Sequence, residues 1–318
     1  MATPLDLTKK LLRLLGPILF LLILSRIDIG DVMDTLRTVR LPFLAMALLL
    51  YPLLVLLKAW RWHMLLQQQG IEYGLPSAFL AYNSSLAVGY VTPGRLGEFV
   101  KALYLRKDLG LTTGRAFSSV LLDRLLDLYA LLLTALAGIA VFTMPQSLVA
   151  LVVPVLVAAG LGPLLILVPG ISRRLTALVA RAATCFVPAQ HRGDIALSFS
   201  GFQTGMEELL DVRLLLPLAL TVIGYVVFYG QCYLLAESLE LPISYGFAAF
   251  CVSLGSLMAL LPISISGLGV RDLTFIAILG TAGLAPEIAI SYSLLFLFVF
   301  NVFGGAIGAL TWWMKPLR

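Results

Sequence analysis

Long runs of apolar residues with almost no charge constrain this chain more than any other feature. Residues 41–57 and 147–168 contain no Asp, Glu, Lys or Arg. Of the 318 residues, 60% are hydrophobic and only 12% are charged, about half the charged fraction of an ordinary soluble domain. The runs do not alternate between apolar and polar residues, as the strands of a membrane barrel do. We therefore expect an all-α, polytopic membrane protein.

The charge, cysteine and histidine content excludes other classes. The net charge of +5 comes from basic residues at the edges of apolar runs, which indicates membrane topology rather than nucleic-acid binding. Cys185, Cys232 and Cys251 lie in or beside apolar runs and are expected to be inert thiols. His63 and His191 lack a second ligand at metal spacing, so we expect no metal site, no histidine-based triad and no cofactor.

The order of apolar and charged segments predicts six crossings, with both termini in the cytoplasm and the chain in the inner (plasma) membrane. Lys9, Lys10 and Arg13 precede a first crossing that lacks a cleavage site. Residues 25–40 are typical of a short interfacial helix, and the Trp and basic residues of 58–62 are expected at the headgroup level. The crossings are expected at residues 14–24, 41–57, 115–143, 147–168, 214–235 and 285–313.

Two further apolar pieces, residues 76–90 and 245–261, are short for a crossing and run into breaks that contain Pro and Gly. A short helix follows each break, so we expect two re-entrant hairpins, one from each face of the membrane.

The two halves of the chain also resemble each other. A shift of 173 positions places Gly110 over Gly283 and Ala116 over Ala289. We expect one transmembrane domain, residues 1–318, built as an inverted repeat. Its parts are a first repeat at 41–143, a linking span and cytoplasmic loop at 144–212, and a second repeat at 213–314.

The first break contains Pro93 and Gly94, which can end one helix and begin another, and Gly97 follows. Free backbone amides at the start of the next helix, with Arg95 beside them, would form a cradle for a phosphate or another anion. The alternative is a simple Pro-Gly turn in which Arg95 pairs with Glu98.

The helix after the first break carries Asp123, Arg124 and Asp127, with the two carboxylates four residues apart on one face. Three ionisable groups in an apolar helix need partners, and Arg95, Lys101 or Arg106 are the nearest candidates. These charges would either bind a ligand or hold helices together as a static network, and one carboxylate could carry a coupling proton.

The second break contains Pro262, Gly267 and Gly269, followed by Arg271 and Asp272. An arginine that reaches the midplane from the opposite face would give a binding cavity a second cationic contact. A Gly-rich packing point with a local Arg271–Asp272 pair is the alternative.

The run from Gly94 to Glu98, with Lys101 and the later Asp123, Arg124 and Asp127, resembles the transmembrane, flippase-like region of lysylphosphatidylglycerol synthases. The stretch from Gly267 to Asp272 is similar to a second signature of that family, which more often ends in Glu. The resemblance implies translocation of a lipid between leaflets. It does not imply aminoacyl transfer, which belongs to a separate soluble domain that we do not expect because the sequence ends at Arg318, just after the last span.

The leading hypothesis is therefore a lipid transporter, not an enzyme, in which Arg95, Arg124 and Arg271 hold an anionic or polyprenyl-phosphate-linked headgroup. One alternative is a membrane enzyme that acts on a lipid phosphate, with Asp123 or Asp127 as base. Another is a non-transporting subunit that presents lipid to a glycosyltransferase. The expected partners are membrane lipids, anionic headgroups beneath the basic loop 173–192, and a second copy or a lipid-biosynthesis protein.

Overall fold

The computed structural model describes residues 22–317, apart from 24, 26, 187–191, 262, 263 and 265. Within these residues the chain forms helices joined by turns, and no strand is present. The all-α prediction is confirmed. The first predicted crossing, Pro262 and His191 lie outside the described residues.

The first half contains one short helix and a group of four longer ones. The short helix α2 is capped by Asp28, whose carboxylate accepts a hydrogen bond from the Gly30 amide at 2.7 Å. The elements are α2 (Ile29–Arg37), α3 (Leu41–Gln68), α4 (Leu75–Tyr90), the 3-10 turn η1 (Leu96–Phe99), α5 (Val100–Leu109) and α6 (Thr113–Val141).

Three helices link this group to a second one. The linking helices are α7 (Gln146–Leu167), α8 (Pro169–Phe186) and α9 (Arg192–Leu209). The second group contains η3 (Val212–Leu214), α10 (Leu215–Ser238), α11 (Tyr245–Ala259), α12 (Val270–Thr281), α13 (Pro286–Phe296), the π-helical segment η4 (Leu297–Phe303) and α14 (Gly304–Met314).

Four of the described helical segments are long and apolar enough to cross a membrane: Leu41–Gln68, Thr113–Val141, Val212–Ser238 and Pro286–Met314. The pair Val152–Leu165 and Gly170–Val179, bent by 88°, is long and apolar enough when its two helices are taken together, and it brings the number to five if it is one span. In the predicted linking region 144–212, the part after α7 is mostly the helices α8 and α9.

Helix α3 continues through Gln68, well past the end predicted at residue 57. At 1.5 Å per residue, 28 residues span roughly 42 Å, which exceeds the hydrocarbon thickness of about 30 Å. Residues 58–62 therefore lie inside the helix and not at its end. Trp62 and Arg61 are buried against neighbouring helices, whereas Trp60 is 46% exposed.

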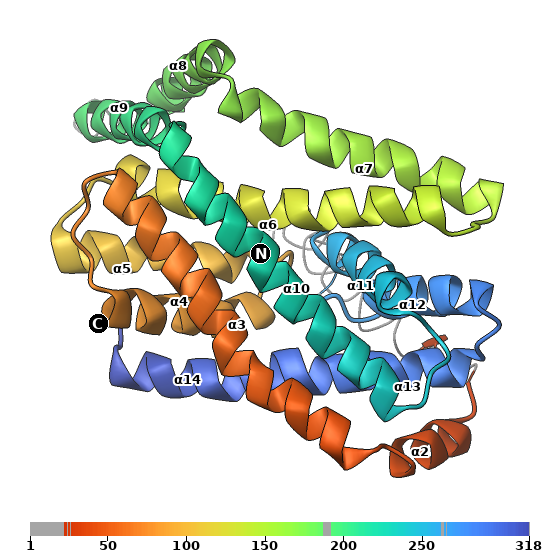
Figure 1. Ribbon diagram of the computed structural model, residues 1–318. Helices are drawn as coiled ribbons and strands as arrows, with labels where there is room; N and C mark the ends of the chain where they lie inside the picture. Colours follow the sequence, from red (N-terminus) through yellow and green to blue (C-terminus); the bar gives the residue numbers. More distant parts are fainter. Residues whose placement is uncertain are drawn as a thin grey trace, which may run out of the picture.

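Helices α3 and α10 run side by side and cross α6 and the α13–α14 segment obliquely, and a short pair lies at each end of the bundle (Figure 1). Helices α4 and α5 lie at the end that also holds the C-terminus, whereas α11 and α12 lie at the opposite end. The pairs α3–α10, α4–α14 and α6–α11 pack against each other. The two hairpins thus enter from opposite ends, and their breaks lie toward the middle.

The turns that join the helices correspond between the halves. Gly70 follows α3 with φ 65°, and Glu240, 170 positions later, follows α10 with φ 54°. Gly110 follows α5 with φ 67°, and Gly283, 173 positions later, follows α12 with φ 78°. In both halves a left-handed residue thus follows the end of the corresponding helix.

Candidate functional site

Buried charges gather where α3, α6 and the first break meet. Asp123 and Asp127 of α6 both face α3, and Arg61 of α3 lies between them. Its guanidinium contacts Asp123 Oδ1 at 2.5 Å and Asp127 Oδ1 at 2.9 Å. The Arg61 side chain is 1% exposed. Arg61 is therefore central to this site, although the sequence analysis placed it at the headgroup level.

Lys101 joins the hairpin to Asp123. Its ammonium group forms an ion pair with Asp123 Oδ2 and lies 4.1 Å from the centroid of the Tyr82 ring. The Lys101 side chain is fully buried. This contact fixes the start of α5 against α6, because a buried ammonium group is stable only with a close counter-ion.

Arg124 connects the first break to α6. Its Nη1 forms an ion pair with Glu98, and its Nη2 contacts Asp127 Oδ2 at 2.6 Å and donates to the Tyr82 hydroxyl at 2.9 Å. Glu98 therefore pairs with Arg124 and not with Arg95, so the local Arg95–Glu98 turn is wrong. The other carboxylate oxygen of Glu98, Oε1, is buried and has no hydrogen-bond partner in the described part of the chain.

Lys58 completes the ring around Asp127. Its ammonium group lies 3.2 Å from Asp127 Oδ1 and 4.9 Å from the centroid of the Tyr225 ring. The Tyr225 hydroxyl donates to the Asp127 backbone carbonyl at 3.0 Å. Through this tyrosine, α10 of the second half also contacts the charged cluster.

Two glycines allow the first break to bring Glu98 this close. A Cβ on Gly97 would lie 2.4 Å from the Val88 carbonyl, and a Cβ on Gly89 would lie 2.5 Å from Glu98 Cγ. Gly94 and Arg95 both have left-handed backbone, with φ of 59° and 55°. Any larger residue at position 97 would push the loop away from α4.

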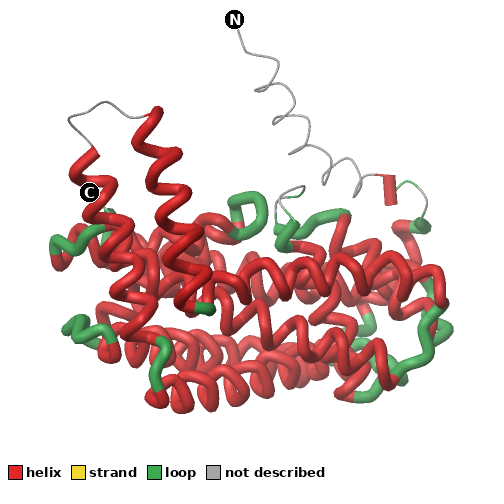
Figure 2. The backbone as a smooth tube through the Cα atoms, turned by 90° about the horizontal axis from the view of Figure 1, so that it is seen from above, coloured by secondary structure: helices red, strands yellow, loops and turns green. Residues whose placement is uncertain are grey.

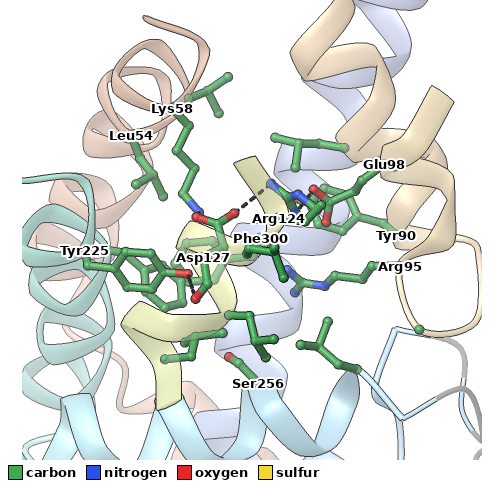
Figure 3. A pocket seen from close by; sticks show the side chains of 18 of the residues that line it. Leu54, Lys58, Tyr90, Arg95, Glu98, Arg124, Asp127, Tyr225, Ser256 and Phe300 are labelled. Atoms are coloured by element: carbon green, nitrogen blue, oxygen red, sulfur yellow. Dashed lines mark hydrogen bonds and ion pairs between the residues drawn. The ribbon is translucent and has the colours of Figure 1, made fainter. Parts of the chain in front are cut away.

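A cavity of about 220 Å³ lies beside this cluster, between the two hairpins. Figure 3 shows Lys58 and Arg124 converging on Asp127, with Arg95 next to Phe300. The cavity is lined by residues of both halves, including Tyr51, Leu54, Tyr90, Glu98, Tyr225, Phe228, Ser256, Phe296 and Phe300.

Arg95 differs from the other cations at the cavity. It forms no ion pair with any residue that the structure describes, and its guanidinium lies 5.6 Å from the centroid of the Tyr90 ring. Its side chain lines the cavity. Arg95 is thus a partly buried cation that presents its donors to the cavity.

The second break has a different arrangement. Arg271 is buried; it contacts Asp272 at 3.3 Å and Ser293 Oγ at 3.2 Å and lies 5.0 Å from the Phe296 ring centroid. Asp272 Oδ2 accepts the Gly269 amide at 2.7 Å, which caps α12. These contacts correspond to the local pair weighed as the alternative for this break.

The two breaks touch each other directly. The Ser266 hydroxyl donates to the Tyr90 backbone carbonyl and accepts the Asn301 side-chain amide, the latter at 2.8 Å. Asn301 belongs to the π-helical segment η4, a rare geometry that is often found at functional sites. Gly267, with φ 75°, packs so closely that a Cβ would lie 2.4 Å from Ala259 Cβ.

The structure sorts the predicted site residues into three groups. Gly94, Arg95, Glu98, Arg124 and Asp127 line the cavity. Lys101 and Asp123 lie behind it as an ion pair, and Gly97 supports the loop. Arg271, Asp272, Gly267 and Gly269 build the second break but do not line the cavity, Pro93 lies in the first break, and Pro262 is outside the described residues.

The first hairpin is also fastened at the end of the bundle. Lys315 Nζ lies 2.7 Å from Asp108 Oδ2, which also accepts the Tyr73 hydroxyl at 2.7 Å. Burial opposes the charge of Asp108, but the hydrogen bonds from Lys315 and Tyr73 hold its pKa below the usual value. Burial and the bond to Asp108 raise the pKa of Tyr73.

No group of three His, Cys, Asp or Glu side chains lies close enough to hold a metal ion in the described ranges. Cys232 and Cys251 are buried and free, as the sequence predicts.

Long apolar helices, two short hairpins and an ionised cluster between them define a multi-pass α-helical membrane protein with a polar site inside the bundle. A family model, the lysylphosphatidylglycerol synthase TM region, matches residues 11–308, and the chain belongs to this family.

One relative is the "UPF0104 membrane protein" of Methanothermobacter thermautotrophicus (strain Delta H). It is 23% identical over 275 residues, which cover 82% of this chain and 81% of the relative. No solved structure matches the chain.

Proposed function

We propose that this protein moves an anionic lipid between the two leaflets of the membrane and binds its headgroup in the cavity between the hairpins. The observation that carries the proposal is the charge around the cavity. Five cations, Lys58, Arg61, Arg95, Lys101 and Arg124, surround three carboxylates, Asp123, Asp127 and Glu98. In their ordinary ionised states they leave two positive charges uncompensated, and an anionic headgroup would supply the missing negative charge.

The cavity size supports a headgroup rather than a whole lipid. A volume of about 220 Å³ is below the roughly 300–1,000 Å³ of pockets that enclose complete small ligands. The acyl or prenyl chains would therefore remain in the surrounding lipid. Removing them from lipid would bring no gain, since the bilayer is as apolar as the protein interior.

The cavity also offers an acceptor. Glu98 Oε1 is buried without a partner among the described residues, although Oε2 of the same carboxylate pairs with Arg124. A headgroup with a hydroxyl or ammonium donor beside its phosphate would satisfy Arg95 and Glu98 together. Anionic phospholipids with a hydroxyl-bearing headgroup, such as phosphatidylglycerol, and polyprenyl-phosphate-linked lipids are the classes we propose as cargo.

We further propose that the two groups of helices are inverted repeats and that no chemical step accompanies transport. The matched turns at Gly70 and Glu240, and at Gly110 and Gly283, support the repeat. The entry of the hairpins from opposite ends supports its inversion (Figure 1).

We propose that the end of the bundle with the C-terminus faces the cytoplasm of a cell whose inner membrane holds the protein. That end carries Arg106, Lys107 and Lys315, whereas Asp31 and Asp34 lie in α2 at the opposite end. Cytoplasmic loops carry an excess of Lys and Arg.

A reconstituted exchange assay tests the proposal. Purified protein is placed in vesicles that contain fluorescent phosphatidylglycerol, and a quencher that acts only on the outer leaflet is added. The rate at which the remaining inner-leaflet label is quenched then measures lipid exchange. Arg95→Ala is expected to slow exchange at least about tenfold, because a charge-assisted hydrogen bond to phosphate contributes about 1.5–3 kcal/mol.

Arg106→Ala is the matched control. It removes an exposed arginine from α5 of the same hairpin and is expected to leave the rate unchanged. Equal rates in the unchanged protein, the Arg95 variant and protein-free vesicles would contradict transport of this lipid. Mass spectrometry of the lipids after the assay is expected to show no new species, and a converted headgroup would instead indicate a membrane enzyme.

A further inference from the structure

Helix α8 carries a line of exposed apolar side chains. Ile171, Leu175, Leu178 and Val179 are 37%, 39%, 61% and 55% exposed. Their spacing of four, three and one places them on one face of a helix, which is the pattern of a helix that buries one side in apolar surroundings. We call this set the α8 stripe. The bundle does not cover it.

The direction of α8 relative to its neighbour suggests what those surroundings are. Gly170–Val179 is bent by 88° from Val152–Leu165, the apolar part of α7. If α7 crosses the membrane, α8 lies in the membrane plane. In Figure 2, α8 and α9 are two neighbouring helices that extend away from the rest of the bundle.

Helix α9 holds α8 in place from the other side. Arg173 of α8 pairs with Glu207 of α9 at 2.8 Å, and the Gln203 side chain donates to the Thr176 hydroxyl. Helix α9 in turn packs on α6, where a Cβ on Gly205 would lie 2.3 Å from Ser118 Oγ. The orientation of the stripe is therefore fixed to the helix that carries Asp123 and Asp127.

The charge of α8 is of one sign only. Its sequence contains Arg173, Arg174 and Arg181 and no acidic residue. Arg174 is exposed and forms no ion pair with a described residue, and it lies beside the stripe on the helix surface. Arginines next to an apolar face are positioned to meet lipid phosphates while the apolar side chains enter the acyl region.

We propose that α8 lies in the headgroup layer of one leaflet, with its stripe toward the acyl chains and Arg174 on the phosphates of anionic lipids. This surface is separate from the central cavity and does not depend on the transported lipid. Its partner is the bilayer surface itself, enriched in anionic lipid.

Spin labels on a cysteine-free variant test this placement. Cys185, Cys232 and Cys251 are replaced by Ala, and single cysteines are introduced as Leu178→Cys, Val179→Cys or, as a control on the exposed side of α9, Ser200→Cys. In vesicles, labels at 178 and 179 are expected to collide several-fold more with oxygen than with a water-soluble nickel complex. The label at 200 is expected to show the reverse. Equal nickel access at all three positions would overturn the proposal.

The proposed contact between Arg174 and anionic lipid is tested separately. Adding phosphatidylglycerol to phosphatidylcholine vesicles is expected to lower the nickel access of the label at 178, and Arg174→Gln is expected to abolish that shift. A shift that is absent, or that persists in the Arg174→Gln variant, would overturn the role of the anionic lipid. All labelled sites are exposed, so the substitutions leave the packing of α9 on α6 unchanged, and gel filtration checks this.

Discussion

The two groups of helices have the same order of elements but opposite chemistry at matching positions. Helix α4 begins 170 positions before α11, and α5 begins 170 positions before α12, whereas α6 begins 173 before α13. With these offsets Arg61 corresponds to Gln231 and Lys58 to Phe228. Asp123 corresponds to Phe296 and Asp127 to Phe300.

The second half places an aromatic cluster where the first has ion pairs. The ring centroids of Phe296 and Phe300 lie 4.6 Å apart, and Phe228 lies 5.2 Å from Phe300. All three phenylalanines line the cavity. One half thus supplies the charges of the site and the other an apolar wall, so a similar backbone plan does not require similar residues at the centre.

The largest effect is expected from the pair Arg61 and Gln231. Arg61→Leu removes one of the two arginines that contact both buried carboxylates, Asp123 and Asp127, and should destabilise the protein by about 3–5 kcal/mol. Gln231→Leu removes one hydrogen bond to the Ala47 carbonyl and should cost about 1 kcal/mol. Thermal unfolding in detergent measures both, and equal losses would contradict the contrast between the halves.

Substitution of Gly97 in the first break should slow lipid exchange more than substitution of a glycine at an ordinary helix end. Gly97→Ala places a Cβ against the Val88 carbonyl, which displaces Glu98 and should lower lipid exchange strongly. Gly110→Ala meets no atom within 4 Å and has only a left-handed backbone to strain. Lipid exchange by the Gly110 variant at the rate of the unchanged protein, beside a slow Gly97 variant, is the expected result. Two equally slow variants would argue against a specific role of the break.

Alanine at the corresponding helix ends Gly110 and Gly283 should destabilise the protein equally, unlike the substitutions at the corresponding central positions. Gly110 and Gly283 both have positive φ and open space around the position of a Cβ. Alanine at either site should cost about 1–2 kcal/mol through left-handed strain. Unfolding temperatures that fall by the same amount in the two variants would support the repeat, and a change confined to one would weaken it.

The smallest effect is expected at the end of the bundle, where Tyr73 of the first half corresponds to Ile243 of the second. Because the pKa of Asp108 is lowered in the folded state, its contribution is present above its unfolded pKa of about 3.9 and is lost as pH falls through the folded value. Asp108→Asn should therefore reduce stability slightly at neutral pH and remove this part of the acid sensitivity. Unfolding measured from neutral to acidic pH tests this, with Asp31→Asn as an exposed control. An unchanged acid profile in the Asp108 variant would contradict the assignment.

The sequence predicted the helical elements better than it predicted the contacts of their charges. The hairpin elements begin and end within a few residues of the expected positions, because Pro, Gly and the change from apolar to charged residues act locally. Arg61 was assigned to the surface since alternating Trp and basic residues also occur at helix ends. The signal that pointed inward was the stretch 123–127 of α6, where two carboxylates flank a single arginine inside an apolar helix.

Arg271 shows the opposite error, since the sequence suggested a contact with ligand and the structure shows contacts within the protein. A buried cation after a break looks like a ligand contact in the sequence, but Gly269 and Asp272 form a cap that holds Arg271 among Phe296, Ser293 and Asp272 itself. Only the packing of α12 on α13 distinguishes these two roles, and that packing is not local in sequence.

The opposed hairpins have an electrostatic consequence at the centre of the bundle. In each hairpin one helix ends, α4 or α11, beside another that begins, α5 or α12. The partial charges at these ends, roughly half a unit each, have opposite sign and largely cancel. The scaffold itself therefore contributes little field there, and the preference for a headgroup of one sign depends on side chains that single substitutions can change.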